Sequence, residues 1–529
     1  MGSFQKPRKP GSDIKPTNDG CAPTPHGSAR RRPAWLMAGV LIASLGGSQG
    51  LPAEDIKENI LEDVWQVILI RGQRLGYAHT LTWATGAGNE KRIWSESVTH
   101  MTVARFGGGL AMTLTQLTEE DDDGNLKSFT LDTKNPPISH TVVSGEVRGD
   151  TLHVTTTAAG KTTRSQQPWD ADVKSPVYQD RLLQEDPIEV GETRTIRVFD
   201  PQFLKVGEVT LTGEQPAETQ LLDGTRLELQ RTGISHSLIP GFTITSYQNE
   251  DGETLKTETN LLGMVTYTVS REEAVKEIAG AQLDLALDTL VRVTPIADAH
   301  TRKTIVYDVS VEGPQKMLSL PEGPTQSVAR KTEQTVRVSV RAADPSAEVP
   351  GRRAEAVDAM YIRSSRYLEI EHPQVVAHAE AAAEKLTSST EIALAMERYV
   401  HEKLAEKNFS TALATAAEVA SSLEGDCTEH AMLLAAMLRV KQIPSRVAVG
   451  LVYAENHSGF AGHMWTEANL NGRWVPLDAT LGLGGTGAGH LKFSDSSLSD
   501  DGPAPVTAFV PLVGLVEKMR IAVVEVGSE

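Results

Sequence analysis

The sequence predicts an α+β protein in which a β-rich N-terminal part precedes a part that combines helices with an antiparallel sheet. Apolar and polar residues alternate with period two over much of residues 54–343, with Gly and Pro between the runs, and the period becomes helical after about residue 354. A chain of 529 residues is several times the usual length of one domain, about 100 to 200 residues. We therefore expect more than one domain.

Stretches rich in Gly, Pro and charged residues divide the chain into five segments. They are an export segment (1–53), a β-rich domain (54–280), a small β module (281–343), a linker (344–353) and a domain with helices (354–529).

The overall composition is that of a globular protein, with 40% hydrophobic and 23% charged residues. There are 51 Lys and Arg against 69 Asp and Glu, so the formal net charge is −18. A surface of this sign repels nucleic acid and anionic lipid. We therefore expect no nucleic-acid partner.

The N-terminus has the pattern of an export signal. Three arginines at 30–32 precede the apolar stretch 35–45, and the small residues of 46–50 follow it. The apolar stretch is short for a membrane span, which needs about 20 residues. We expect an exported protein (periplasmic, cell-surface or secreted) that meets the membrane only if this segment stays uncleaved as an anchor.

Export would make the cysteine content informative. The chain has two cysteines, and Cys21 lies ahead of the apolar stretch and would leave with it. Cys427 would then be a single thiol in an oxidising compartment, which marks it as a candidate reactive group. The alternative is an inert buried cysteine that packs as a small hydrophobic residue.

Local patterns predict specific elements in the β-rich domain. The runs 64–70 and 77–83 are separated by a turn and predict a hairpin, and Ser270 with Glu273 has the spacing of a capping box that would begin a short helix to about 278. Its scattered histidines have no metal-ligand spacing, so we expect surface or cross-strand roles for them: His79, His100, His140, His153 and His236.

The domain with helices begins with two helical patterns. Residues 373–386 are Ala-rich with Pro in the first turn, and Ser388 with Glu391 forms a second capping box. Ile392, Met396 and Tyr399 follow at helical spacing, which predicts a face packed in the core.

Cys427 lies at the predicted start of a helix over 428–440. The first turn of a helix carries unpaired N–H groups and partial positive charge, which favour a thiolate. The same groups can bind a developing oxyanion, so we provisionally assign the oxyanion donor to the backbone N–H of Cys427.

Two strands joined by a tight turn follow that helix. Residues 446–453 and 462–470 have strand patterns, and Asn471-Gly472 is a strong signal for a type I′ hairpin turn.

The turn fixes a register for the hairpin. With a two-residue turn, Leu470 lies opposite Arg473 and Trp465 lies opposite Asp478. His463 and Asp478 then lie on the same face as diagonal neighbours, about 7 to 8 Å apart at the backbone. An imidazole and a carboxylate can bridge that separation.

A thiol, an imidazole and a carboxylate in this order suit nucleophilic catalysis. Cys427 would be the nucleophile, His463 the base, and Asp478 the acid that holds the imidazole in one tautomer. This chemistry requires no cofactor and no metal.

This part of the chain resembles the transglutaminase-like superfamily within the papain-like thiol enzymes, in its bacterial exported form. The matching residues are Gly425-Asp426-Cys427, Glu429-His430-Ala431, Ile443-Pro444-Ser445-Arg446, Gly450, His463-Met464-Trp465, Glu467 and Trp474-Val475-Pro476-Leu477-Asp478-Ala479-Thr480. The resemblance covers roughly 354–491. It implies a helix bearing the cysteine on an antiparallel sheet, and the same triad of Cys427, His463 and Asp478.

The resemblance also implies a function: an exported thiol acyl-transfer enzyme that acts on amide bonds of a protein or peptide substrate. It could be a cysteine protease or amidase that transfers the acyl group to water, or an acyltransferase that uses an amine, and we favour peptide or isopeptide hydrolysis.

Two alternatives stay open at this point. The chain could be a non-catalytic binding or scaffold protein at the cell surface, or Cys427, His430 and His463 could be zinc ligands, because Cys-x-x-His is an acceptable ligand spacing.

Further expectations concern residues around the triad and the C-terminus. We expect His430 to pack or cap the helix, His457 and His490 to lie in loops, and Trp465 and Trp474 to belong to the core. Residues 508–526 would add a helix and an edge strand to the catalytic domain.

Overall fold

The computed structural model describes residues 59–527, except for short gaps at 106–107, 136–138, 159, 240, 261, 278–282, 314–318, 348–356, 405–413, 501–507, 510–511 and 513–514. The expected export segment 1–53 and most of the expected linker 344–353 lie outside the described residues. No helix in the described part of the chain is long and apolar enough to cross a membrane.

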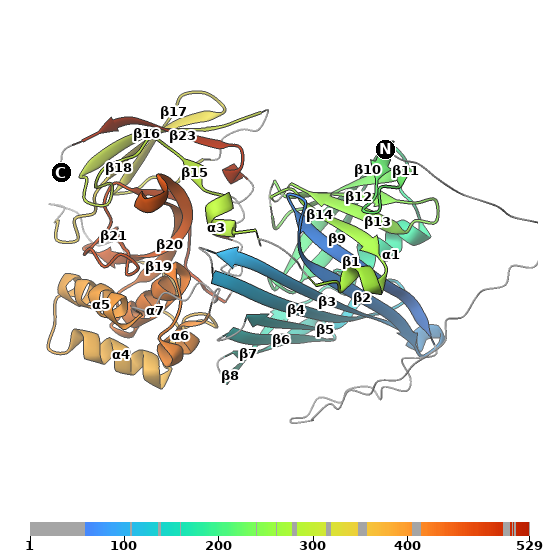
Figure 1. Ribbon diagram of the computed structural model, residues 1–529. Coiled ribbons are helices and arrows are strands. Elements are labelled where there is room, and N and C mark those ends of the chain that lie inside the picture. Colours follow the sequence, from blue (N-terminus) through green and yellow to red (C-terminus); the bar gives the residue numbers. More distant parts are fainter. Residues whose placement is uncertain are drawn as a thin grey trace, which may run out of the picture. The chain divides into compact units, whose positions relative to one another are not determined.

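The first part of the structure is one antiparallel sheet of fourteen strands in the order β8-β7-β6-β5-β4-β3-β2-β1-β14-β13-β12-β11-β10-β9 (Figure 1). The strands are β1 (Ile60–Ile70), β2 (Gln73–Thr85), β3 (Arg92–Arg105), β4 (Gly108–Glu120), β5 (Leu126–Asn135), β6 (Ser139–Arg148), β7 (Thr151–Ala158), β8 (Lys161–Pro168), β9 (Thr193–Asp200), β10 (Lys205–Gln220), β11 (Arg226–His236), β12 (Thr243–Gln248), β13 (Thr254–Thr259) and β14 (Met264–Val269). Two meanders of consecutive hairpins therefore meet where β1 pairs with β14.

The sheet curls back on itself. Phe199 of β9, at one edge, packs against Phe129 of β5, with ring centroids 5.1 Å apart, although nine strands separate β9 from β5 in the sheet order. Trp169 packs edge-on against the same Phe199 at 5.3 Å. These aromatic side chains bury large apolar areas, which stabilises the curled form.

The elements that local sequence patterns predicted in this part of the chain are present. The expected hairpin is β1–β2, with Val67 opposite Tyr77. Ser270 caps the short helix α2 (Arg271–Ala274) by accepting the N–H of Glu273, and the helix ends before the predicted residue 278. A further short helix, α1 (Tyr178–Glu185), lies between β8 and β9.

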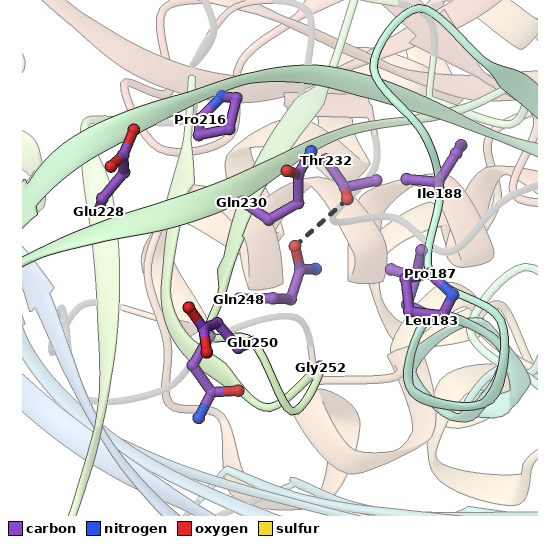
Figure 2. Close-up of a pocket in the computed structure, with 11 residues that line it drawn as sticks. Leu183, Pro187, Ile188, Pro216, Glu228, Gln230, Thr232, Gln248, Glu250 and Gly252 are labelled. Atoms are coloured by element: carbon purple, nitrogen blue, oxygen red, sulfur yellow. Dashed lines mark hydrogen bonds between the residues drawn. The ribbon is translucent and has the colours of Figure 1, made fainter.

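A pocket of about 440 Å³ opens on the β11–β12 side of this sheet (Figure 2). Its two buried polar side chains are engaged with protein atoms: Thr232 donates to Oε1 of Gln248 (3.3 Å), and Gln248 Nε2 donates to Ser246 (2.8 Å). Gln230 at its wall donates to the Glu214 carbonyl. These amide and hydroxyl groups are satisfied within the fold, which is consistent with a structural role.

The second part of the structure has helices on one side of a central sheet and a smaller sheet on its other side (Figure 1). The helices are α4 (Pro373–Ala383), α5 (Ser389–Lys403), α6 (Ala416–Ser422) and α7 (Cys427–Val440), and α3 (Leu285–Asp288) precedes this group in the chain. The central sheet contains β15 (Val291–Arg292), β20 (Gly459–Leu470), β19 (Ser445–Ala454), β22 (His490–Ser496) and β21 (Arg473–Leu477); the smaller one contains β17 (Gln326–Arg330), β18 (Thr335–Arg341), β16 (Thr304–Val311) and β23 (Met519–Val526).

The predicted helices are present, and α7 is the central one. The helix expected over 373–386 is α4, and Ser388 caps α5 by accepting the N–H of Glu391. From Cys427 to Arg439 every residue of α7 is buried. Because this helix is covered on every side, α7 forms the core against which the other helices and the sheet pack.

The expected C-terminal edge strand is β23, which pairs with β16 at the edge of the smaller sheet. Side chains of β16 and β18 pack against the face of the central sheet that α7 does not cover; Tyr307 meets Phe460 at 5.4 Å, for example. The central sheet is thus buried on both faces, which removes water from the residues that it carries.

Candidate active site

Cys427 is the first residue of α7, as predicted. Asp426 caps the helix by accepting the N–H of Thr428 (3.0 Å), and the Glu429 side chain accepts the N–H of Asp426 (3.0 Å). Gly425 has φ +142°, and a Cβ there would lie 2.3 Å from the Glu429 side chain. The Gly-Asp-Cys sequence therefore permits a tight entry into the helix that presents the cysteine.

The backbone at the start of α7 holds the Glu429 side chain inside the protein. Its carboxyl group also accepts the N–H of Ala414 (3.1 Å) and the hydroxyl of Thr428 (2.8 Å). Burial, aided by the nearby Asp426 charge, raises the pKa of Glu429 to about 8. Glu429 thus fixes the start of α7 from within the core.

The hairpin register predicted from Asn471-Gly472 is confirmed. Asn471 and Gly472 both have positive φ, Leu470 pairs with Arg473, and the ladder continues to Thr466 opposite Leu477. Asp478 follows β21 directly. Nε2 of His463 lies 2.8 Å from Oδ2 of Asp478, so the imidazole and the carboxylate are hydrogen-bonded.

Cys427 joins this pair. All three side chains are buried, and the Cys427 side chain hydrogen-bonds to the His463 ring, whose Nε2 faces Asp478. Burial alone would lower the pKa of His463. The charges of Asp478 and Cys427 and the hydrogen bonds to both outweigh burial and raise this pKa to about 10, so the site favours the imidazolium form.

Asp478 is correspondingly held as a carboxylate. Burial opposes its ionisation, but the charge and hydrogen bond of His463, with a further contribution from His490, keep the pKa of Asp478 well below its ordinary value. Its Oδ1 accepts the N–H of Thr480 at 2.9 Å. A carboxylate bound on both oxygens has a fixed orientation.

His490 is a member of this cluster that we expected in a loop, and that expectation is wrong. It is the first residue of β22, is buried, and places Nε2 3.0 Å from Oδ2 of Asp478, the oxygen that also faces His463. It reaches the site because β22 pairs with β19, with His490 opposite Val452. That long-range pairing leaves no local signal beyond a histidine that begins an alternating apolar run.

Glu397 of α5 is a second residue that the sequence did not single out. Its Oε1 accepts the backbone N–H of Asp478 (3.0 Å) and that of Gly485 (3.2 Å). Burial raises the pKa of Glu397 to about 7 despite these hydrogen bonds. Glu397 therefore positions the backbone that carries Asp478 and the loop that follows it.

Other residues of the motif have structural positions. Trp465 is buried and packs near both imidazoles, with its ring 6.2 Å from that of His463 and 5.4 Å from that of His490. Arg446 of β19 pairs with Glu467 of β20 at 2.7 Å, which ties these two strands together. We infer that these residues shape and support the site.

Two further histidines differ in position. His430 is buried one turn into α7 and its Nδ1 hydrogen-bonds to the Asp426 carbonyl (2.6 Å), which agrees with the expected capping role. His457 is exposed in a short 3-10 helix between β19 and β20, within the loop where it was expected.

The geometry bears on the possibility of a metal ion. Within the described part of the chain, His463, Asp478 and His490 form a group whose ligand atoms all lie within 4.8 Å of one another. Metal binding would need both Nε2 atoms without protons, whereas both now face an acceptor-only carboxylate oxygen and must donate to it. With a metal on its Nε2, His490 would carry its proton on Nδ1, which is buried and has no acceptor. The hydrogen-bonded arrangement therefore fits these residues better than a metal.

Comparisons with known proteins agree with the motif. Residues 377–479 match the sequence profile of the Transglutaminase-like superfamily. No curated protein sequence matches the chain.

Three solved structures are similar in part. One is a proposed cysteine protease from Cytophaga hutchinsonii (17% identity, 42% of this chain and 85% of that chain, TM-score 0.28). Another is a β-barrel-like protein of a domain of unknown function from Brucella abortus (12% identity, 39% and 94%, TM-score 0.30). The third is a proposed protease from Parabacteroides distasonis (13% identity, 64% and 64%, TM-score 0.18).

The sequence match spans the helix that begins at Cys427 and the hairpin that joins His463 to Asp478. Residues 377–479 of this chain therefore form a transglutaminase-like domain.

Proposed function

We propose that this chain is a thiol acyl-transfer enzyme that acts on amide bonds through Cys427, His463 and Asp478. The hydrogen-bonded series from the Cys427 thiol through the His463 ring to the Asp478 carboxylate, at the first turn of α7, supports the proposal. An imidazole held between a thiol and a carboxylate is suited to exchange a proton with the sulfur.

In the proposed reaction the Cys427 sulfur attacks the carbonyl carbon of an amide while its proton resides on His463. The carbon–nitrogen bond then breaks, and His463 gives its proton to the leaving amine, which leaves a thioester. Water or an amine next attacks the thioester, loses a proton to His463, and breaks the carbon–sulfur bond. Asp478 holds the ring in one tautomer and stabilises its positive charge throughout.

We favour hydrolysis of a peptide or isopeptide bond and propose a protein or peptide as the substrate. The backbone N–H of Cys427 remains our proposed oxyanion donor, because Asp426 already binds the N–H groups of Thr428 and Glu429. Export of the chain, guided by residues 1–53, is part of the same proposal, since a protein substrate outside the cell suits such an enzyme.

The test is to incubate the purified chain with a peptide library, with and without an added primary amine, and to analyse products by mass spectrometry. Cleavage alone would indicate a hydrolase, and incorporation of the amine would indicate transamidation. The matched control is Cys427→Ala, which should abolish either product. Absence of any Cys427-dependent product, together with slow alkylation of this thiol, would favour the non-catalytic scaffold instead.

A further inference from the structure

One oxygen of Asp478 serves two imidazoles. Oδ2 lies 2.8 Å from Nε2 of His463 and 3.0 Å from Nε2 of His490. His490 lies outside the segment 377–479 that matches the superfamily profile, so its contact with the carboxylate is a feature of this chain beyond that match.

The direction of these hydrogen bonds follows from the chemistry of the groups. An ionised carboxylate only accepts, so both histidines carry a proton on Nε2 and donate it to Oδ2. The second oxygen accepts the N–H of Thr480 (2.9 Å). Three donors from separate points of the chain therefore hold the carboxylate in one plane.

The surroundings of His490 favour its neutral form. The titratable groups that face its ring are Asp478, His463 at 6.0 Å between ring centroids, and His300 at 5.8 Å. His300 donates Nε2–H to the Tyr453 carbonyl (2.8 Å). Burial lowers the pKa of His490 and the positive charge on His463 lowers it further, whereas Asp478 opposes both.

A neutral N–H donor on Oδ2 of Asp478 changes how strongly this oxygen binds the His463 proton. The hydrogen bond from His490 stabilises the negative charge of Asp478 and so weakens the hold of the carboxylate on the His463 proton. During amide cleavage His463 must release this proton to the leaving amine. A carboxylate that binds the imidazolium too tightly would slow that step.

We propose that His490 is a positioning residue that acts through Asp478: it fixes the carboxylate plane and moderates the hold of Asp478 on the His463 proton. The proposal rests on the proposed function for its catalytic consequence. The hydrogen-bond geometry that it concerns can be tested without turnover.

The test compares two amide side chains of different length at position 490. Gln can bring its N–H group to about the place of Nε2, and Asn is one methylene too short to do so. In His490→Asn we expect the His463 ring to titrate about half to one pH unit higher than in the wild type. Nitrogen NMR of the His463 imidazole measures this titration. His490→Gln should lie within about 0.3 unit of the wild type.

Turnover gives the second readout. In His490→Asn the alkaline limb of the kcat/KM profile should move to higher pH and kcat should fall about tenfold with KM unchanged, while His490→Gln should stay within about threefold of the wild type. An unshifted or lowered His463 titration in a folded Asn variant, or equal defects in both variants, would overturn the role of His490. Absence of turnover in the wild type would overturn the proposed function alone, because the NMR titration decides the role of His490 separately.

Discussion

The two parts of this molecule use polar side chains in opposite ways. In the curled sheet, polar groups mostly pair across neighbouring strands near the surface, as Thr157 and Thr162 do at 3.0 Å between their hydroxyls. In the transglutaminase-like domain, ionisable groups are buried beside one another, and His463, Asp478 and His490 share one hydrogen-bonded cluster. Surface pairs contribute little to stability, whereas a buried group costs several kcal/mol unless it is satisfied.

A buried acid of the curled sheet provides a comparison. Glu120 of β4 is buried with the guanidinium of Arg181 at 3.0 Å, and burial raises its pKa although the Arg181 charge opposes this shift. Around Cys427, several buried acids have raised pKa values, including Glu397 at about 7 and Glu429 at about 8. Clustered, shifted groups of this kind are typical of functional sites.

The largest expected effect comes from removing the imidazole of the triad. We expect His463→Ala to reduce turnover at least about 10³-fold, which corresponds to about 4 kcal/mol of transition-state stabilisation. The same variant should react more slowly with iodoacetamide at pH 6 to 7, because the imidazolium that pairs with the sulfur is gone. Alkylation rates measured against pH check this without a known substrate.

A histidine of the curled sheet is the matched control. His153 on β7 hydrogen-bonds to Gln166 (3.2 Å), and His153→Ala should leave alkylation of Cys427 unchanged. Equal rates for the wild type and His463→Ala would contradict the special role of the buried cluster.

Arg439 of α7 provides the next largest effect, on stability. This fully buried guanidinium donates to the carbonyls of Arg363 (2.8 Å) and Ser445 (2.8 Å) and to the Ser445 hydroxyl (3.2 Å), and burial lowers its pKa to about 10. Arg439→Ala would leave these carbonyls without their donor, so we expect a loss of about 3 to 5 kcal/mol in the free energy of unfolding, measured in urea.

The comparison is a surface arginine that makes a contact of similar length, in this case with a carboxylate. Arg337 of β18 pairs with Asp308 at 2.8 Å but is 40% exposed. Arg337→Ala should cost no more than about 1 kcal/mol. Similar losses in the two variants would show that burial does not determine the importance of these arginines.

The raised pKa values also predict how stability depends on pH. Glu429 has a folded pKa of about 8, above its ordinary 4.5, so the folded state keeps a proton that the unfolded chain loses, and stability falls as pH rises toward 8. His463 has a folded pKa of about 10, above 6.5, and its contribution is present below pH 6.5 and is lost as pH rises through 10. Both groups therefore lower the free energy of unfolding as pH rises from 6.5 to 8.

We therefore expect the free energy of unfolding to fall over this interval, with Glu429 contributing on the order of 1 to 2 kcal/mol. Urea titrations at pH 6.5 and 8 measure it. Glu429→Gln cannot ionise and should show a smaller fall between the two pH values, even if it is less stable at both. A variant with the same pH dependence as the wild type would refute the assignment to Glu429.

The sequence predicted the part of the site that local rules determine. The turn at Asn471-Gly472 fixes the hairpin, so Asp478 could be placed beside His463, and the helical pattern over 428–440 placed Cys427 at a helix start. His490 was missed because it reaches Asp478 through pairing of β22 with β19, which no short motif encodes. Glu397 was missed for a similar reason, since it arrives from α5.

The same limit applies to the curled sheet. Individual hairpins follow from alternation and turns, but the pairing of β1 with β14 joins strands about two hundred residues apart. Such pairing depends on the sum of many side-chain contacts, for example Phe129 with Phe199, and not on a local signal.

The smallest expected effect comes from one substitution made in both parts of the molecule. Thr157→Ala removes an exposed hydroxyl on β7, and we expect a change within about 0.5 kcal/mol, with alkylation of Cys427 unchanged. Thr466 of β20 is buried and donates to the Ala431 carbonyl of α7 (2.9 Å), so Thr466→Ala should cost about 1 to 2 kcal/mol. Because the same atoms are deleted in each case, the difference in unfolding free energy isolates the effect of burial. If Thr157→Ala were the more damaging change, polar groups of the curled sheet would contribute more to stability than those around α7.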